Sequence, residues 1–398
     1  MTADLDLPVL PPVLPMLARS VASVPDQGEG PPSYVYEPKW DGFRAIVYRD
    51  GDTVRIDSRN AKPMERYFPD VVEAVLDALP ERCVVDGEIV IARAGDDGAR
   101  LDFALLSQRI HPAASRVRLL AGQTPAAFVV FDVLALADDD VSARPLRERL
   151  DVLDGLGLTG PLVFPTPRTF NAGVAREWFG SFEGAGLDGV VAKPLDAPYE
   201  ANKRTMLKVK HARTADVVLA GYRLHKTSTE AKPLIGSLLL GLYDPAGQDD
   251  SGRTLAGGAG QLQFVGVSAS FPAARRASLF EELAPLVVEP GTVAAEEHSW
   301  ADWQDPAAAA EGKERRPGAV SRWSSGKDLS FTPLRAERVL EVGYDHMEGT
   351  RFRHTAQFKR WRPDREPASC TYEQLEEPIS YDLGELLPGA PLATLAES

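Results

Sequence analysis

The sequence reads YEPKWDGFR at residues 36–44, and this stretch places a lysine between two apolar segments. Residues 34–37 and 44–48 are rich in aromatic and β-branched side chains, which is typical of strands. Asp41-Gly42 predicts a turn that reverses the chain between them. Lys39 therefore has a fixed place at the junction of two predicted strands.

A lysine in such a place can act as a nucleophile. Its amine is mostly protonated near neutral pH, and it attacks an electrophile only if burial or neighbouring cations lower its pKa. Arg44 supplies a neighbouring cation. From these residues alone, an ordinary hairpin with exposed charges explains the stretch equally well.

Length and composition indicate a globular protein. The 398 residues, 44% of them hydrophobic, suffice for two or three domains with their own cores. No apolar run approaches the roughly 18 residues of a membrane span, and Asp4 and Asp6 stand where a signal peptide has basic residues. Cys83 and Cys370 are too few for a disulfide framework or a cysteine-rich zinc site. We expect a cytoplasmic protein.

The net charge of −14 argues against a nucleic-acid partner, but the charge is unevenly distributed. Residues 313–365 contain 13 Lys and Arg against seven Asp and Glu, a local charge of +6. A second basic stretch runs over 203–213, and acidic residues concentrate at 138–140 and near the C-terminus. The basic stretches indicate either a nucleic-acid surface or simply solvated faces.

Periodicity predicts alternating strands and helices before residue 211. Asp50-Gly51 between 45–48 and 53–56 is a strong hairpin signal. Apolar residues at helical spacing predict helices over 68–79 and 101–110 and a helix opened by Pro145. Further strands are expected at 84–91, 127–134, 188–193 and 206–210.

Two of these strands carry charges that need an explanation. Asp86 and Glu88 interrupt an apolar strand, and buried acids require partners. Lys208 and Lys210 alternate along a strand, so they project from one face, where like charges repel unless a polyphosphate lies beside them. An exposed strand face is the alternative. The chain has no P-loop motif, so ATP, if used, is held in another way.

After His211 the pattern changes to short strands separated by turns. Strands expected at 217–222, 238–243, 262–267 and 338–344, with a helix over 273–286, favour a small barrel. We expect a loop at 245–260, a flexible crossing at 294–317 and a domain boundary near Ala212.

Six stretches, in order, resemble the motifs of the covalent nucleotidyltransferases, which include ATP-dependent DNA ligases, RNA ligases and mRNA capping enzymes. The resemblance runs from about Pro11 to Asp364 and is greatest to the two-domain bacterial ligases of the actinobacterial ligase C type. The stretches are YEPKWDGFR (36–44), DGE (86–88), FDVL (131–134), DGVVAK (188–193), LKVK (207–210) and FKRWRPDR (358–365).

The resemblance implies an α+β fold with three parts. An adenylyltransferase domain with antiparallel sheets and flanking helices is expected over 1–211 and an OB-fold barrel over 212–366. An acidic C-terminal tail is expected over 367–398.

The same resemblance implies DNA ligation in three steps, with ATP and Mg²⁺ or Mn²⁺ as cofactors. Lys39 would attack the α-phosphate of ATP and form a lysine-AMP phosphoramidate. AMP would pass to the 5′-phosphate of a nick, and the 3′-hydroxyl would displace it. Positioning and charge neutralisation carry most of the catalysis in such transfers.

Roles are carried over residue by residue. Lys39 is the expected nucleophile, Asp41 orients the 3′-hydroxyl and Arg44 contacts the 5′-phosphate. The other expected nucleotide contacts are Glu37 and Phe131 at adenine, Arg59 and Glu88 at ribose or phosphate, Lys208, Lys210 and Arg204 at the α-phosphate, and Arg362 and Asp364 at pyrophosphate. Glu88 and Asp188 are the expected metal ligands.

Two positions depart from the family pattern. Asp188 replaces the usual glutamate, so its carboxylate reaches one methylene less far, and Arg365 replaces the usual lysine.

The expected partner is nicked duplex DNA, bound by a monomer at the nucleoid, together with repair proteins such as a repair polymerase. The expected roles are DNA repair, replication and recombination. An RNA ligase or capping-type enzyme is the alternative within the superfamily. A catalytically silent OB-fold nucleic-acid-binding protein is the alternative outside it.

Overall fold

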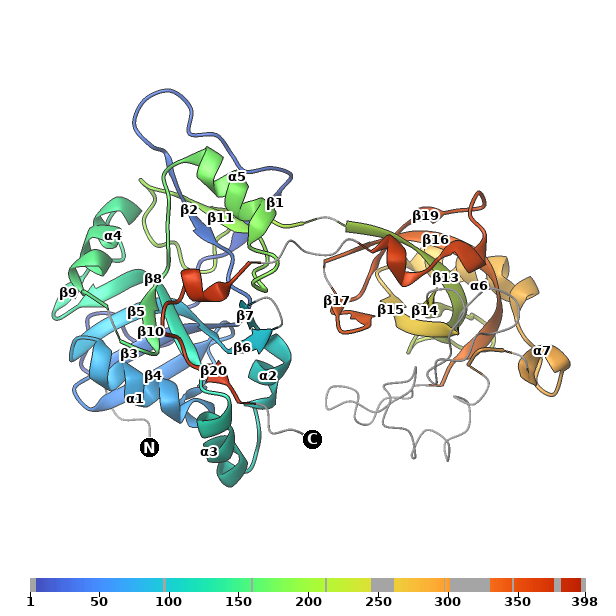
Figure 1. Ribbon diagram of the computed structural model, residues 1–398, viewed down its shortest axis with the longest axis horizontal. Helices are drawn as coiled ribbons and strands as arrows, with labels where there is room; N and C mark the ends of the chain where they lie inside the picture. Colours follow the sequence, from blue (N-terminus) through green and yellow to red (C-terminus); the bar gives the residue numbers. More distant parts are fainter. Residues whose placement is uncertain are drawn as a thin grey trace. The chain divides into compact units, whose positions relative to one another are not determined.

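The computed structural model describes residues 5–95, 98–158, 160–211, 213–244, 261–296, 298–300, 330–345, 347–375 and 381–394. The chain divides into two compact units, Met1–His211 with Pro378–Ser398, and Ala212–Glu377 (Figure 1). The second unit is thus an insertion between two parts of the first.

The larger sheet of the first unit has six strands in the order β10-β8-β5-β3-β4, with β9 paired to β8. Its strands are β3 (Phe43–Asp50), β4 (Thr53–Ser58), β5 (Arg82–Val90), β8 (Ala127–Leu136), β9 (Asp139–Asp140) and β10 (Val163–Pro165). The predicted β3–β4 hairpin is confirmed, with Asp50 opposite Thr53.

Helices cover this sheet, and their buried faces follow the predicted helical spacing (Figure 1). The helices that follow the larger sheet's strands along the chain are α1 (Pro69–Ala78), α2 (Phe103–Gln108), α3 (Ala114–Gln123) and α4 (Leu146–Gly155), with the short 3-10 helix η1 (Glu65–Tyr67). Val75 of α1 and Leu150 and Leu153 of α4 pack in one hydrophobic cluster with Phe128 and Val130 of β8. This cluster is the main core of the first unit. The sequence analysis did not predict α3.

A second sheet of four strands, in the order β1-β12-β11-β2, carries much of the candidate site. Its strands are β1 (Ala18–Val21), β2 (Tyr34–Pro38), β11 (Val190–Pro194) and β12 (Met206–Val209), and α5 (Ala172–Ser181) packs on it (Figure 1). Neighbouring strands in the two sheets run antiparallel except for the edge strands β1 and β10.

The predicted reversal at Asp41-Gly42 is wrong. β2 pairs with β11 in the four-stranded sheet, whereas β3 pairs with β4 and β5 in the six-stranded sheet. Residues 39–42 therefore cross from one sheet to the other. Gly42 is needed for close approach, because a Cβ there would lie 2.1 Å from the carbonyl oxygen of Ile89.

The C-terminal segment is divided between the two units instead of forming the single acidic tail expected over 367–398. The 3-10 helices η4 (Pro367–Ser369) and η5 (Tyr372–Gln374) lie in the second unit, whereas η6 (Leu383–Glu385) lies in the first. Strand β20 (Leu392–Ala393) joins β6 (Ala92–Gly95) and β7 (Gly98–Leu101) in a three-stranded sheet. Apolar residues within this acidic segment bury against the first unit and determine its path.

The second unit contains a five-stranded antiparallel sheet in the order β15-β14-β13-β16-β19. Its elements are β13 (Arg213–Leu224), β14 (Ile235–Tyr243), β15 (Leu262–Ser268), β16 (Thr332–Tyr344), β19 (Gln357–Trp361), the hairpin β17 (Met347–Glu348) and β18 (Arg351–Phe352), and the helices α6 (Ala273–Leu283), η2 (Ala284–Leu286) and α7 (Val293–Glu296). A parallel bridge joins Ser268 at the end of β15 to Ala356 just before β19.

Two expected flexible segments fall mainly outside the described residues. The loop predicted at 245–260 and residues 301–317 of the predicted crossing lie there. Trp300, at the edge of that crossing, is fully buried in the core of the second unit. In the described part of the chain, no helix has the length and apolar character that crossing a membrane requires.

Candidate active site

Lys39 is held by the strand that precedes it and by the chain before β11. Its backbone N–H donates to the carbonyl of Gly189 (2.8 Å), and its carbonyl accepts from the N–H of Asp188 (2.9 Å). Gly189 has a φ of +109°, and a Cβ there would lie 2.0 Å from the carbonyl oxygen of Val209. Only glycine lets the chain pass this close, so it fixes Asp188 beside Lys39.

The Asp188 carboxylate joins two of the predicted lysines. Its Oδ2 lies 2.6 Å from Lys39 Nζ and 2.6 Å from Lys210 Nζ. Burial by itself raises the pKa of Asp188, but the two ammonium groups outweigh burial and hold it below its usual value. One carboxylate therefore positions two cations, and the cluster carries a surplus of positive charge.

Lys208 adds to this surplus. Burial lowers the pKa of Lys208, and the charges of Lys210 and Lys39 lower it further, as does Arg59. Asp188 opposes these effects. Lys39, Lys210 and Arg59 are thus close enough to Lys208 to affect its pKa, although the Arg59 side chain is exposed.

Arg44 is held by a buried carboxylate. Its Nε and Nη2 donate to the two oxygens of Asp86 at 2.5 and 2.6 Å, and the Tyr199 hydroxyl donates to Asp86 Oδ2 at 2.6 Å. Burial and then Asp86 raise the pKa of Tyr199 well above its usual value, so the phenol keeps its proton. For Arg44, burial alone would lower the pKa, but Asp86 outweighs burial and raises it. The guanidinium therefore stays charged in one orientation.

Glu88 lies beside these cations on β5. Burial raises the pKa of Glu88 to about 7, although Arg44 and Lys39 oppose that shift. Its carboxyl consequently titrates near neutral pH, unlike an exposed glutamate. Asp41, at the crossover between the sheets, is half-buried.

Glu37 and Phe131 lie in the interior near Lys193. The Glu37 side chain is 3% exposed, and its Oε2 lies 2.7 Å from Lys193 Nζ. Its Oε1 is a buried acceptor without a hydrogen-bond partner among the described residues, and burial raises the pKa of its carboxyl. Lys193 Nζ and Arg44 Cζ lie 4.4 and 4.3 Å from the centre of the Phe131 ring. The Glu37 Oε1 atom, which lacks a hydrogen-bond partner among the described residues, could therefore accept a hydrogen bond from an amino group of a ligand that lies beside the Phe131 ring.

Arg204 is exposed in the segment before β12, and the structure gives it no ion pair within the described ranges. The structure does not bring Arg204 to the lysine cluster.

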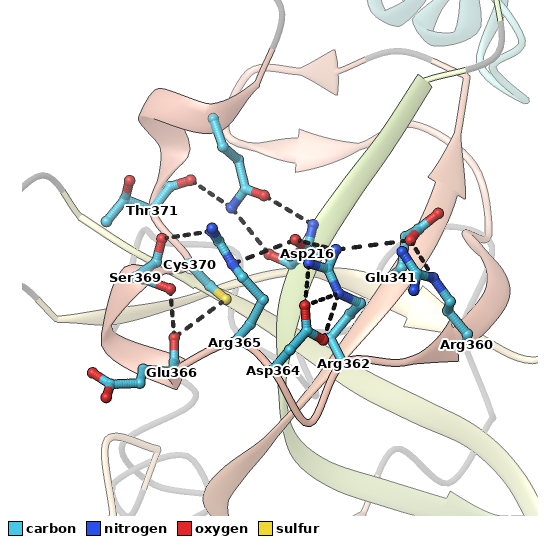
Figure 2. Close-up of polar contacts among 11 residues, drawn as sticks. Asp216, Glu341, Arg360, Arg362, Asp364, Arg365, Glu366, Ser369, Cys370 and Thr371 are labelled. Carbon is cyan, nitrogen blue, oxygen red and sulfur yellow. Dashed lines mark hydrogen bonds and ion pairs between the residues drawn. The ribbon is translucent and has the colours of Figure 1, made fainter.

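Arg362 and Asp364 lie in the second unit, directly after β19 (Figure 2). Arg362 Nη1 donates to both oxygens of Asp216, at 2.9 and 2.8 Å, and its Nη2 lies 2.7 Å from Asp364 Oδ2. Glu341 adds a third carboxylate at 3.8 Å. The hydrogen bond from Arg362 holds the pKa of Asp364 at about 2. Arg362 is thus enclosed by acceptors.

The sequence analysis missed three partners of the predicted residues. Tyr199 holds Asp86, Asp216 holds Arg362, and Lys193 holds Glu37. Asp86 was flagged as an acid in need of a partner, and Lys193 lies inside a recognised motif. Tyr199 and Asp216 carry no local signal, because their partners are 113 and 146 residues away.

A lysine amine and a carboxylate beside the crossover between the two sheets, with further lysines at β12, favour a nucleotidyltransferase as the class of protein. Residues 15–210 match the family model described as ATP dependent DNA ligase domain. The chain is 53% identical to DNA ligase C of Mycobacterium tuberculosis over 390 residues, which cover 97% of this chain and 99% of that protein. It is 54% identical to DNA ligase C2 of Mycolicibacterium smegmatis over 375 residues, which cover 94% and 97%.

One solved structure, described as Pmar-Lig_Pre., has a TM-score of 0.50 at 14% identity and covers 88% of this chain and 68% of that one. This likeness concerns the fold alone. The chain belongs to the ATP-dependent DNA ligases.

Proposed function

We propose that Lys39 is the nucleophile of this ligase. In the first step its neutral amine attacks the α-phosphorus of ATP, an N–P bond forms, the bond to the pyrophosphate oxygen breaks, and the amine gives up a proton. The observation that supports this role is the placement of Lys39 by Asp188 beside Lys208 and Lys210. These lysines would neutralise the charge that develops on the α-phosphate.

The adenine would lie beside Phe131 and Glu37. The orphaned Oε1 of Glu37 can accept a hydrogen bond from the exocyclic amine of adenine, which guanine lacks at that position. Asp41 would orient the 3′-hydroxyl of the nick, and Arg44, held by Asp86, would bind its 5′-phosphate. Arg59, Glu88 and Arg204 would complete the contacts to ribose and phosphate, and Arg362 and Asp364 would orient pyrophosphate.

The donor set suits magnesium or manganese, because carboxylate and phosphate oxygens are the ligands of hard cations. Within the described ranges, no three His, Cys, Asp or Glu side chains form a ready-made metal site. Glu88 would therefore hold the ion together with phosphate oxygens. Asp188 fits a metal less well, because two ammonium groups already contact its Oδ2. The bound ion would neutralise phosphate charge.

We assign the first unit as the adenylyltransferase domain and the second as an OB-fold domain. The order β15-β14-β13-β16-β19, the helix α6 between β15 and β16 and the parallel bridge from Ser268 to Ala356 are the features of a five-stranded Greek-key barrel. Its basic residues would bind the backbone of nicked duplex DNA, with a steep salt dependence.

A monomer of this kind would act on the chromosome in the cytoplasm, in DNA repair, replication and recombination and alongside other repair proteins. The relatives are DNA ligases, so an RNA ligase, a capping-type enzyme and a silent binding protein are not favoured.

The test uses ATP labelled at the α-phosphate. Wild-type protein with magnesium should become labelled, and nicked DNA added afterwards without ATP should be sealed with release of AMP. Lys39→Ala and Lys39→Arg should each lower labelling by at least about 1000-fold. Lys39→Arg keeps the positive charge beside Asp188, so it separates loss of the nucleophile from loss of the ion pair. Sealing of nicks by either variant at the wild-type rate would exclude this role.

A further inference from the structure

The segment of residues 381–394, here called the C-terminal strap, returns from the second unit and packs on the first. Leu383 and Leu387 are each 1% exposed. They belong to one hydrophobic cluster with Trp40 and Phe131. This cluster lies on the face of β8 formed by Ala127, Val129 and Phe131, opposite the main core, which takes Phe128 and Val130.

Polar contacts fix the path of the strap along β7. Asp382 Oδ1 accepts hydrogen bonds from the N–H groups of Ala99 and Gly384, each at 2.9 Å. The Tyr381 ring meets the Phe182 ring with centroids 4.9 Å apart. The strap ends as β20, which pairs in parallel with β6.

The strap approaches β7 closely at Gly98. Gly98 has a φ of +121°, and a Cβ there would lie 3.0 Å from the side-chain carbons of Asp382. Glycine at this position both adopts the backbone conformation and leaves room for the strap. This close fit makes the strap an integral part of the first unit.

The strap shares its cluster with two residues that define the candidate site. Trp40 follows the proposed nucleophile directly, and its Nε1 donates to Thr166 Oγ1 at 2.9 Å in the interior. Phe131 is the proposed adenine contact and is 5% exposed. Leu383 and Leu387 belong to the same buried cluster as both side chains.

We propose that Leu383 and Leu387 are positioning residues for the nucleotide. They support Trp40 and Phe131, and so hold Lys39 and the adenine-binding surface in place. This inference rests on the proposed roles of Lys39 and Phe131. Removing a buried leucine side chain leaves a cavity that neighbours fill only in part, so the supported side chains shift. Shifts of about 1 Å are enough to lower the rate of a positioned reaction severely.

The experiment compares Leu387→Ala with a matched control, Leu153→Ala. Both leucines are 1% exposed, but Leu153 of α4 packs on the opposite face of the sheet, away from Trp40 and Phe131. Binding of ATP is measured by calorimetry in EDTA, so that no chemistry follows, and unfolding temperatures are measured for both variants. We expect similar losses of unfolding temperature, but a dissociation constant for ATP raised about tenfold only in Leu387→Ala.

A milder pair of variants guards against unfolding. Asp382→Ala removes the acceptor of two backbone hydrogen bonds at the exposed edge of the strap, and Asp382→Asn keeps an acceptor oxygen. We expect Asp382→Ala to weaken ATP binding about threefold and Asp382→Asn to restore it.

Unchanged ATP affinity in both Leu387→Ala and Asp382→Ala would overturn the inference, as would equal weakening in Leu153→Ala. The binding measurement does not depend on Lys39 chemistry. If wild-type protein did not become labelled at Lys39, the proposed role of Lys39 would be wrong. The calorimetry would still show whether the strap positions the nucleotide.

Discussion

Asp188 in the first unit receives two ammonium groups, whereas Arg362 in the second unit is enclosed by three carboxylates. Both clusters are built from the same kinds of ion pair, but only the cluster around Asp188 has a surplus of charge. Lys208 increases the positive surplus around Asp188, whereas Arg360 and Arg365, together with Arg362, balance the three carboxylates (Figure 2).

The difference indicates when each cluster can engage a phosphate. The lysine cluster can bind an anion without giving up a partner, because its cations outnumber its carboxylate. Arg362 must exchange Asp216 for a phosphate oxygen, and the ion pair that it loses offsets part of the gain. We therefore expect the lysines to dominate initial ATP binding and Arg362 to act in a later, conditional contact.

The largest effect should come from removing the charge of Asp188. In Asp188→Asn the amines of Lys39 and Lys210 lose their shared partner and repel each other, so Lys39 is no longer held in line with the α-phosphate. Single-turnover labelling from ATP should slow about 100-fold. Binding of ATP should not weaken, because the positive surplus grows.

Asp188→Glu is the control for this change. It keeps the charge and restores the usual family residue, so labelling should stay within about tenfold of wild type. A wild-type labelling rate in Asp188→Asn would mean that the carboxylate does not position Lys39.

A smaller effect is expected from opening the other cluster. Asp216→Ala removes the carboxylate that Arg362 Nη1 contacts, and Asp364 remains as the partner of Nε and Nη2 of this 18%-exposed side chain. Because the pair is partly solvated, the free energy of unfolding of the second unit should fall by about 2 kcal/mol, as measured by urea denaturation.

Glu341→Ala provides the comparison, because Glu341 meets Arg362 only at 3.8 Å and Arg360 at an exposed surface. Glu341→Ala should lower the free energy of unfolding of the second unit by less than about 1 kcal/mol. Equal losses of unfolding free energy in Asp216→Ala and Glu341→Ala would show that Asp216 stabilises Arg362 no more than Glu341 does.

The smallest effect concerns pH. Burial raises the pKa of Glu88 from 4.5 to about 7, so the folded protein holds this proton more tightly than the unfolded chain does. The resulting stability is fully present below pH 4.5 and is lost as the pH rises through about 7. Between pH 5 and 8, the free energy of unfolding of wild type should fall by roughly 1–2 kcal/mol relative to Glu88→Gln.

The measurement is urea denaturation of both proteins across that pH range. Parallel pH profiles would mean that Glu88 titrates as an exposed carboxyl does. Glu88 would then be ionised at neutral pH, and its negative charge would reduce the positive surplus of the lysine cluster.

Local pattern predicted much of the first unit. The β3–β4 hairpin follows from Asp50-Gly51 between alternating strands, and α1 and α4 follow from apolar residues at helical spacing. The same logic failed at Asp41-Gly42, which was interpreted as a turn. Gly42 is needed because the chain passes against β5, and β2 takes its partner from a strand about 150 residues later.

The sequence pattern could predict that Lys208 in β12 and Lys210 directly after it lie close together, because their alternation carries that information. The candidate site was not predictable where a distant side chain holds a charged group in place, as Tyr199 and Asp216 do. The strap escaped notice because acidic composition obscured Leu383 and Leu387, which lie four residues apart and are buried. Such pairs become visible only once tertiary contacts are known.

The insertion of the second unit between two parts of the first has a consequence for biosynthesis. The ribosome makes Lys39 and Phe131 early, but it must then translate the whole second unit before Leu383 and Leu387 emerge. At typical elongation rates this interval lasts roughly 10 to 30 s. During that time the apolar cluster that contains Trp40 and Phe131 lacks Leu383 and Leu387. The face of the first unit around Trp40 and Phe131 is therefore completed only after the whole second unit has been translated.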